Sequence, residues 1–329
     1  MSAISNFYAR AGNNVLEINP PSDLVDIHIT NHGSDWLWAA FSVFSVFTLV
    51  HSFIFAFSSS SNRVLKKALF VGPLITNFVM AIVYFTYASN LGNAGVPVEF
   101  HHVTTSKGLG VRQMFYVKFI GYFLCWPFVL YSIEVATHTL DLSSKTSAGE
   151  TISGFISIIS GLFIKVFATE VFVLGLLIGV LIESTYKWGY FTFGAAGLIF
   201  AISLVIGSLV HATRSIKTSK FAILVISVEL IVWILYPVAW GLCEGGNVIQ
   251  PDSEAVFYGV LDLITFAVVP TILTFLNASG LDENHLLHFH LRSQYSNEKV
   301  ANSPRESGDT AVPPSANPIV ADNEPTETV

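Results

Sequence analysis

Residues 221–242 read FAILVISVELIVWILYPVAWGL, and Glu229 is the only charged side chain in this run. A helix needs roughly 20 consecutive apolar residues to cross the hydrocarbon core of a bilayer. The run has that length, and an apolar stretch this long exceeds what a strand in a soluble core requires. It therefore predicts a membrane-spanning helix.

Six further apolar runs of similar length surround this one, at residues 36–57, 68–87, 113–135, 152–181, 188–210 and 256–275. The fourth run is longer than a span requires, so we expect its membrane part to be near residues 160–182. Hydrophobic residues make up 52% of the chain and charged residues 12%, about half the charged share of a soluble domain. The fold class predicted is an all-α membrane protein with seven transmembrane helices.

The charges between the runs predict the orientation, because cytosolic loops are rich in Lys and Arg. The first loop, residues 58–67, holds three bases and no acid, and the fifth, residues 211–220, does the same. Residues 1–35 are acidic and belong to the opposite side. We expect an extracellular segment at 1–35, a membrane domain at 36–277 and a disordered, acidic cytosolic tail at 278–329.

The composition argues against several classes of function. The net charge is −7 with no basic stripe, which argues against a nucleic-acid partner. Cys125 and Cys243 are too few for a zinc site, and no nucleophile and base are arranged as in an enzyme. The sequence His285-Leu-Leu-His288-Phe-His290 is expected to be an amphipathic extension at the membrane surface, with metal binding as the alternative.

Ionisable residues inside the predicted spans are the first candidates for function, since each costs roughly 2.5–3.5 kcal/mol to insert at mid-bilayer. Lys118 and Asp262 are expected at similar depth from the same side, which favours an internal ion pair. The other ionisable residues within the runs are Glu134, Lys165, Glu170 and Glu229. For most of these, an internal ion pair or a snorkelling end residue is an equally good interpretation.

Aromatic residues in the sixth run fall on one helical face. Trp233, Tyr236 and Trp240 are spaced i, i+3 and i+7. An interfacial belt would explain Trp240, but Trp233 lies roughly 10 Å deeper at 1.5 Å per residue. Prolines inside four of the runs should free backbone carbonyls that must be satisfied within the bundle, at Pro73, Pro127, Pro237 and Pro270.

The pattern Trp233-x-x-Tyr236-Pro237-x-x-Trp240, followed by Leu261-Asp262, resembles the sixth and seventh helices of microbial rhodopsins. In that family these aromatic residues flank retinal, and the Asp belongs to the counter-ion of its Schiff base. Aligning the third run on Pro127 places Lys118 where the family has an Arg. It also places Tyr122 where the family has a Trp that stacks on the ring. The resemblance implies an opsin-like bundle with a vestigial retinal pocket.

Three positions depart from the family pattern. Phe266 stands where the resemblance places the lysine that binds retinal, and a Schiff base requires an amine. Gly121 stands in place of the proton acceptor, and Ser132 in place of the proton donor. We therefore expect no covalent retinal and no light-driven pumping.

Further motifs are similar to the fungal opsin-related branch, which includes a thirty-kilodalton membrane heat-shock protein of yeasts. They include Ser184-Thr-Tyr-Lys-Trp-Gly-Tyr190 and Gly245-Gly-Asn247. This resemblance implies a stress-responsive plasma-membrane protein whose partners are the lipid bilayer and other membrane proteins, such as the plasma-membrane proton ATPase. Residues lining the former pocket could instead form a receptor for a small molecule or a non-covalent chromophore. The intramembrane charges could alternatively serve a passive ion or proton transporter.

Overall fold

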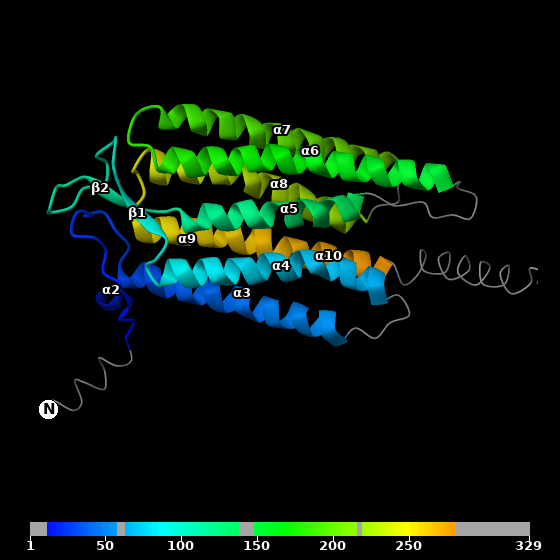
Figure 1. Ribbon diagram of the computed structural model, residues 1–329, viewed down its shortest axis with the longest axis horizontal. Helices are drawn as coiled ribbons and strands as arrows, with labels where there is room; N and C mark the ends of the chain where they lie inside the picture. Colours follow the sequence, from blue (N-terminus) through cyan, green and yellow to red (C-terminus); the bar gives the residue numbers. More distant parts are fainter. Residues whose placement is uncertain (1–11, 58–62, 138–147, 216–218, 281–329) are drawn as a thin grey trace, which may run out of the picture. The chain divides into compact units, whose positions relative to one another are not determined.

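The structure, a computed structural model, describes residues 12–57, 63–137, 148–215 and 219–280. Within these ranges, seven helices are long and apolar enough to cross a membrane, which confirms the predicted count (Figure 1). The first five are α3 (Asn31–Phe57), α4 (Arg63–Ala88), α5 (Val117–Thr137), α6 (Ala148–Val180) and α7 (Lys187–Ser215). The sixth joins α8 (Lys220–Trp240) to the π-helix η1 (Gly241–Gly245). The seventh joins α9 (Pro251–Asp262), the π-helix η2 (Leu263–Val268) and α10 (Val269–Gly280).

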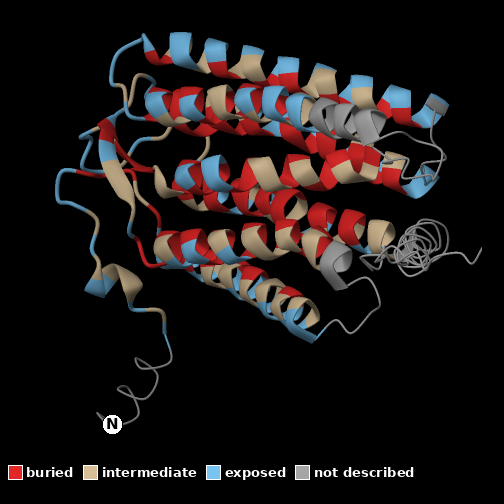
Figure 2. Ribbon diagram, turned by 45° about the vertical axis from the view of Figure 1, so that its right-hand side comes forward, coloured by how far each residue is buried: buried red, intermediate tan, exposed pale blue. Residues whose placement is uncertain are grey.

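Helices that follow one another in the chain pack side by side. The seventh helix closes the ring against α3 and also contacts α4 and α5. Figure 2 shows the buried residues along the inner surfaces of the bundle. In the most apolar stretch of α3 only 17% of residues are buried, against 56% in the seventh helix. Such an outward apolar surface suits lipid as its solvent.

The helix boundaries differ from the prediction at three places. The third helix begins at Val117 rather than at 113, because Val111–Phe115 forms strand β2, which pairs antiparallel with β1 (Asn93–Pro97). The fourth run is helical from Ala148, four residues before the predicted 152, while the stretch long and apolar enough to cross a membrane, Ile159–Val180, agrees with the predicted 160–182. The seventh helix begins at Pro251, five residues before the predicted 256, since proline is favoured in the first turn.

The chain before α3 packs against the hairpin at one end of the bundle. After the short helix α2 (Val15–Ile18), Ile27 forms a parallel bridge with Arg112 of β2. Asp26 accepts hydrogen bonds from the Thr105 hydroxyl and from the amides of Leu109, Gly110 and Val111. The predicted cytosolic tail begins at 278, and from residue 281 it lies outside the described residues.

Acidification is expected to loosen the segment that Asp26 holds. Burial opposes ionisation of Asp26, but its hydrogen bonds outweigh burial and lower its pKa below the ordinary 3.8. A lowered pKa in the folded state stabilises the fold at neutral pH, and this contribution disappears as the pH falls below about 3.8. The protection of the amides of 109–111, measured relative to their intrinsic exchange rates at the same pH, should therefore fall in acid, and Asp26→Ala should remove it at every pH. The same change at the exposed Asp23 should leave it intact.

Pro270 near the start of α10 creates a polar contact between the second and seventh helices. Proline has no N–H to give to the carbonyl four residues earlier, which here belongs to Phe266. That carbonyl instead accepts from the Thr76 hydroxyl at 2.9 Å and lies 3.4 Å from Asn77 Nδ2. The freed acceptor is thus satisfied by the neighbouring helix.

Pro73 in α4 makes the reciprocal contact. The carbonyl that it frees belongs to Leu69, and this carbonyl accepts from Thr274 Oγ1 of α10 at 3.4 Å. The prediction that prolines free carbonyls to be satisfied inside the bundle is confirmed at Pro73 and Pro270. We call this pair of exchanged hydrogen bonds the proline clasp.

Candidate functional site

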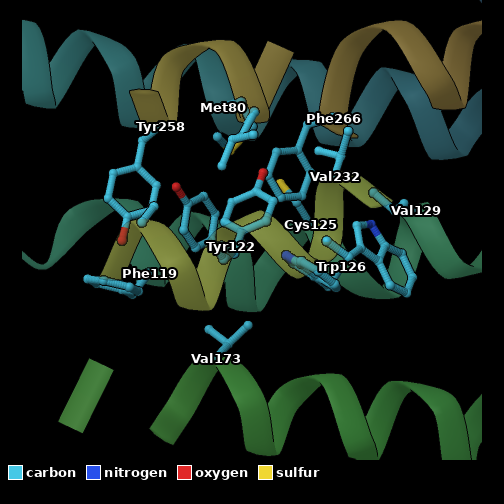
Figure 3. Close-up of a cluster of buried hydrophobic side chains, with 14 of the residues drawn as sticks. Met80, Phe119, Tyr122, Cys125, Trp126, Val129, Val173, Val232, Tyr258 and Phe266 are labelled. Carbon is cyan, nitrogen blue, oxygen red and sulfur yellow. The ribbon is translucent and has the colours of Figure 1, made fainter. Parts of the chain in front are cut away.

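Aromatic side chains fill the centre of the bundle around Phe266, which is fully buried in η2. Its ring stacks on Tyr122 of α5, with centroids 5.6 Å apart and planes inclined by 17°. Trp126, also on α5, lies edge-on at 6.3 Å. Figure 3 shows these rings close together in the centre of the bundle. The centre is therefore closed by side-chain packing.

The three aromatic residues of α8 extend this packing. Trp233 lies 4.6 Å from Trp126 between ring centroids, and Tyr236 is edge-on to Tyr122 at 5.4 Å. Trp240 is fully buried and stacks on Phe191 of α7 at 5.0 Å. The interfacial-belt interpretation therefore fails for Trp240, because the ring faces other helices.

Asp262, at the end of α9, is the polar centre of this aromatic cluster. Three buried tyrosines donate to its carboxylate: Tyr84 from α4 at 2.7 Å, Tyr236 from α8 at 2.8 Å and Tyr122 from α5 at 3.0 Å. Residues from four helices thus meet at one carboxyl group. Tyr84 was not singled out from the sequence, although its place on the buried face of a membrane helix could have suggested a partner for Asp262.

Lys118 does not form the predicted ion pair with Asp262. Its ammonium group instead lies 2.6 Å from Glu244 and 2.6 Å from Glu254. The expected match in depth is wrong because the third helix starts later and the seventh earlier than predicted. Lys118 is the second residue of α5, whereas Asp262 lies roughly 16 Å along its helix at 1.5 Å per residue.

The ion pairs around Lys118 belong to a larger buried cluster at the hairpin end. Arg112 of β2 lies 2.7 Å from Glu254 and donates to Asn247 at 2.7 Å. Both bases and both acids are at most 4% exposed, and their formal charges cancel. Sequence reasoning placed Arg112, Glu244 and Glu254 in loops. Pro251 as a helix start could have put Glu254 in the first turn of a membrane helix.

Gly121 and Ser132 occupy tightly packed positions on α5. A Cβ atom at Gly121 would lie 2.6 Å from Val83 Cγ2 of α4, so a longer side chain has no room there. The Ser132 hydroxyl donates to the Phe128 carbonyl in its own helix at 3.0 Å. Neither position holds a group that can accept and release a proton as a carboxylate does.

The other ionisable residues of the predicted runs take no part in the ion pairs around Lys118. Lys165 of α6 pairs with Glu134 of α5 at 2.5 Å and donates to Ser208 of α7 at 2.6 Å, so the internal ion-pair interpretation is confirmed for these two. Glu229 accepts from the indole of Trp233 at 2.5 Å. The side-chain oxygens of Glu170 are buried and have no hydrogen-bond partner in the described part of the chain.

The helix arrangement and this buried centre define a membrane protein of the opsin type, and comparison with known proteins agrees. Residues 33–277 match the bacteriorhodopsin-like proteins, so the chain belongs to this family. It is 38% identical to the 30 kDa heat shock protein of Saccharomyces cerevisiae, over 94% of each chain. It is 35% identical to the opsin-like protein carO of Fusarium fujikuroi, covering 82% of this chain and 81% of that protein.

Solved structures share the fold. The crystal structure of the light-driven proton pump rhodopsin from Coccomyxa subellipsoidea is similar with a TM-score of 0.61 and 21% identity. The similarity covers 75% of this chain and 97% of the pump. At this identity the comparison establishes the fold and leaves the activity to be argued from the residues.

Proposed function

We propose that this protein is a non-photoactive, opsin-like plasma-membrane protein that acts in the stress response through contacts with other membrane proteins. Regulation of the plasma-membrane proton ATPase is the contact we favour. The observation that carries the proposal is the fully buried Phe266, packed on Tyr122 at the centre of the bundle. This packing supports a function that does not use a covalent chromophore.

The described residues do not fit retinal as a bound cofactor. No lysine occurs in the seventh helix, from Pro251 to Gly280, and Phe266 fills the position that the family pattern gives to the amine. The buried lysines of the described bundle are engaged elsewhere: Lys118 with Glu244 and Glu254, Lys165 with Glu134, and Lys187 with Glu99. We therefore derive no photochemical step.

The relatives support a role in stress. The name of the 30 kDa heat shock protein, 38% identical over nearly the whole chain, favours induction under heat or a related stress. The charge pattern of the loops favours an extracellular N-terminus and a cytosolic C-terminus. In this orientation the acidic segment after residue 280 would be available to cytosolic parts of a partner. We propose no enzymatic activity.

A comparison of plasma membranes from cells that contain the protein and cells that lack it tests this proposal. Plasma membranes from cells with and without the protein, grown with and without heat or weak-acid stress, are assayed for ATP-driven proton pumping in darkness and in light. Loss of the protein should change the stress-dependent proton pumping, and the change should be equal in darkness and in light. Unchanged pumping and survival in cells without it would contradict the proposal, and a change seen only in the light would contradict its non-photoactive part.

The receptor alternative is not favoured, because the aromatic residues that would line a pocket pack on one another. A surface pocket does occur at the start of α3 and α9, lined by His32, Gly33, Asp252, Ser253, Val256 and Phe257, away from the aromatic centre. The transporter alternative would need buried groups that exchange protons. Two of the acids in the described bundle, Glu229 and Asp262, are almost fully buried.

A further inference from the structure

Glu229 in α8 is a buried acid whose only contact described so far is the hydrogen bond from the Trp233 indole. It is fully buried, and within the described ranges no Lys, Arg or His lies within ion-pair distance of it. One oxygen accepts from the Trp233 indole at 2.5 Å. A buried carboxylate without a counter-charge is much more costly than the neutral acid, so Glu229 is the group that carries a proton.

Asp262 has the opposite hydrogen-bonding requirement. An ionised carboxylate is an acceptor only, with about four lone-pair positions. The O–H groups of Tyr84, Tyr122 and Tyr236 donate to three of them at 2.7–3.0 Å. Asp262 is therefore satisfied as a carboxylate and has no need of a proton of its own.

Thr265 is a buried residue of the seventh helix, in η2. Asp262 and Thr265 are three residues apart on the seventh helix, while Glu229 and Tyr236 are seven apart on α8, so each pair shares one helical face. The Thr265 hydroxyl lies close enough to Tyr236 and Glu229 to affect the ionisation of both. Thr265 Oγ1 and Glu229 Oε2 are both buried, yet neither makes a hydrogen bond of ordinary geometry. A hydrogen bond between these two atoms would satisfy both.

We propose that Glu229 and Asp262 are the two ends of a buried proton relay through the hydroxyls of Thr265 and Tyr236. In the transfer, Glu229 Oε2 gives its proton to Thr265 Oγ1, and Thr265 gives its own proton to the Tyr236 oxygen. Tyr236 then passes its proton to Asp262. Glu229 ends ionised and Asp262 neutral, no electron moves, and the reverse steps restore the starting state.

The relay adds an activity to the proposed function and does not depend on it. Apart from the relay residues, the titratable or charged groups that face Asp262 are Tyr84 of α4, together with Tyr122, Cys125 and Lys118 of α5. Within the described ranges, the polar groups that face Glu229 are the indole N–H of Trp233 and the hydroxyl of Thr265. The bundle can thus change its internal charge distribution without a chromophore.

Infrared spectroscopy of the purified full chain tests the relay. One carbonyl-stretch band of a protonated carboxylic acid should be lost in Glu229→Gln and should keep its frequency in Glu170→Gln, the matched acid away from the relay. Asp262→Asn should shift the Glu229 band, because it alters the far end of the same hydrogen-bonded chain. Tyr236→Phe should produce a similar shift without changing a charge.

Variants of Thr265 test whether this residue connects Glu229 to Tyr236 and Asp262. Thr265→Val should abolish the response of the Glu229 band to Asp262→Asn, and Thr265→Ser should retain it. A Glu229→Gln spectrum that loses no band would overturn the proposal. So would a Glu229 band that ignores both Asp262→Asn and Tyr236→Phe, or one that still responds in Thr265→Val. Helical circular dichroism and a single size-exclusion peak identify the variants that are folded. If Asp262→Asn does not fold, Tyr236→Phe still decides the test.

Discussion

The wild-type protein is expected to form no covalent retinal adduct, Phe266→Lys a small amount, and Phe266→Lys combined with Trp126→Ala the most. The first change supplies the missing amine in the centre of the bundle. The second removes a buried indole that packs beside Phe266 and against Trp233, and so provides room for the polyene. Borohydride trapping followed by mass spectrometry measures the adduct directly.

The matched control separates the effect of the added amine from the effect of the added volume. Phe266→Ala combined with Trp126→Ala opens the same volume without an amine and should give no adduct. An adduct on the wild-type protein, or on this control, would show that another lysine reacts and would contradict the proposed loss of chromophore binding. A folded Phe266→Lys/Trp126→Ala variant without adduct would contradict the placement of Phe266 at the former attachment site.

Glu254→Gln is expected to destabilise the bundle by about 3–5 kcal/mol, the usual cost of breaking a buried ion pair from one side. Glu254 lies within 2.7 Å of both Arg112 and Lys118, so its neutralisation leaves one excess buried positive charge. Unfolding in detergent, followed by loss of helical circular dichroism, measures the change. Glu183→Gln, at an exposed position, should stay within about 0.5 kcal/mol of the wild type.

A second substitution tests the charge balance. Arg112→Met combined with Glu254→Gln leaves Lys118 facing Glu244 as a neutral pair, so the two changes should cost less together than the sum of their separate effects. Strict additivity would show that the four charges act independently and would contradict the cluster as a unit.

The seven helices could be predicted from hydropathy because a bilayer demands long apolar runs whatever the helices pack against. Their ends depend on other interactions. Residues 113–115 belong to the predicted run of the third helix, yet they form the end of strand β2 because β1 supplies a pairing partner. This difference places Lys118 at the start of its helix, and the earlier start of the seventh helix places Glu254 beside it.

Part of the candidate site was also predictable. Spacing placed Trp233 and Tyr236 on one face, and the family pattern singled out Tyr122, Asp262 and Phe266. Contacts between distant segments were not predictable, because they depend on how helices are rotated and staggered. The three tyrosines on Asp262 come from three different helices, and no spacing within one helix indicates such a convergence.

The proline clasp has a consequence for how α4 and the seventh helix move. Each helix gives up one internal hydrogen bond and takes its replacement from the other, so a slide of one helix by a single turn, about 5.4 Å, breaks both replacements together. Alanine at Pro270 would return a donor to the Phe266 carbonyl and leave Thr76 competing for it. The two helices therefore fix each other's axial position, and neither can slide without breaking both hydrogen bonds.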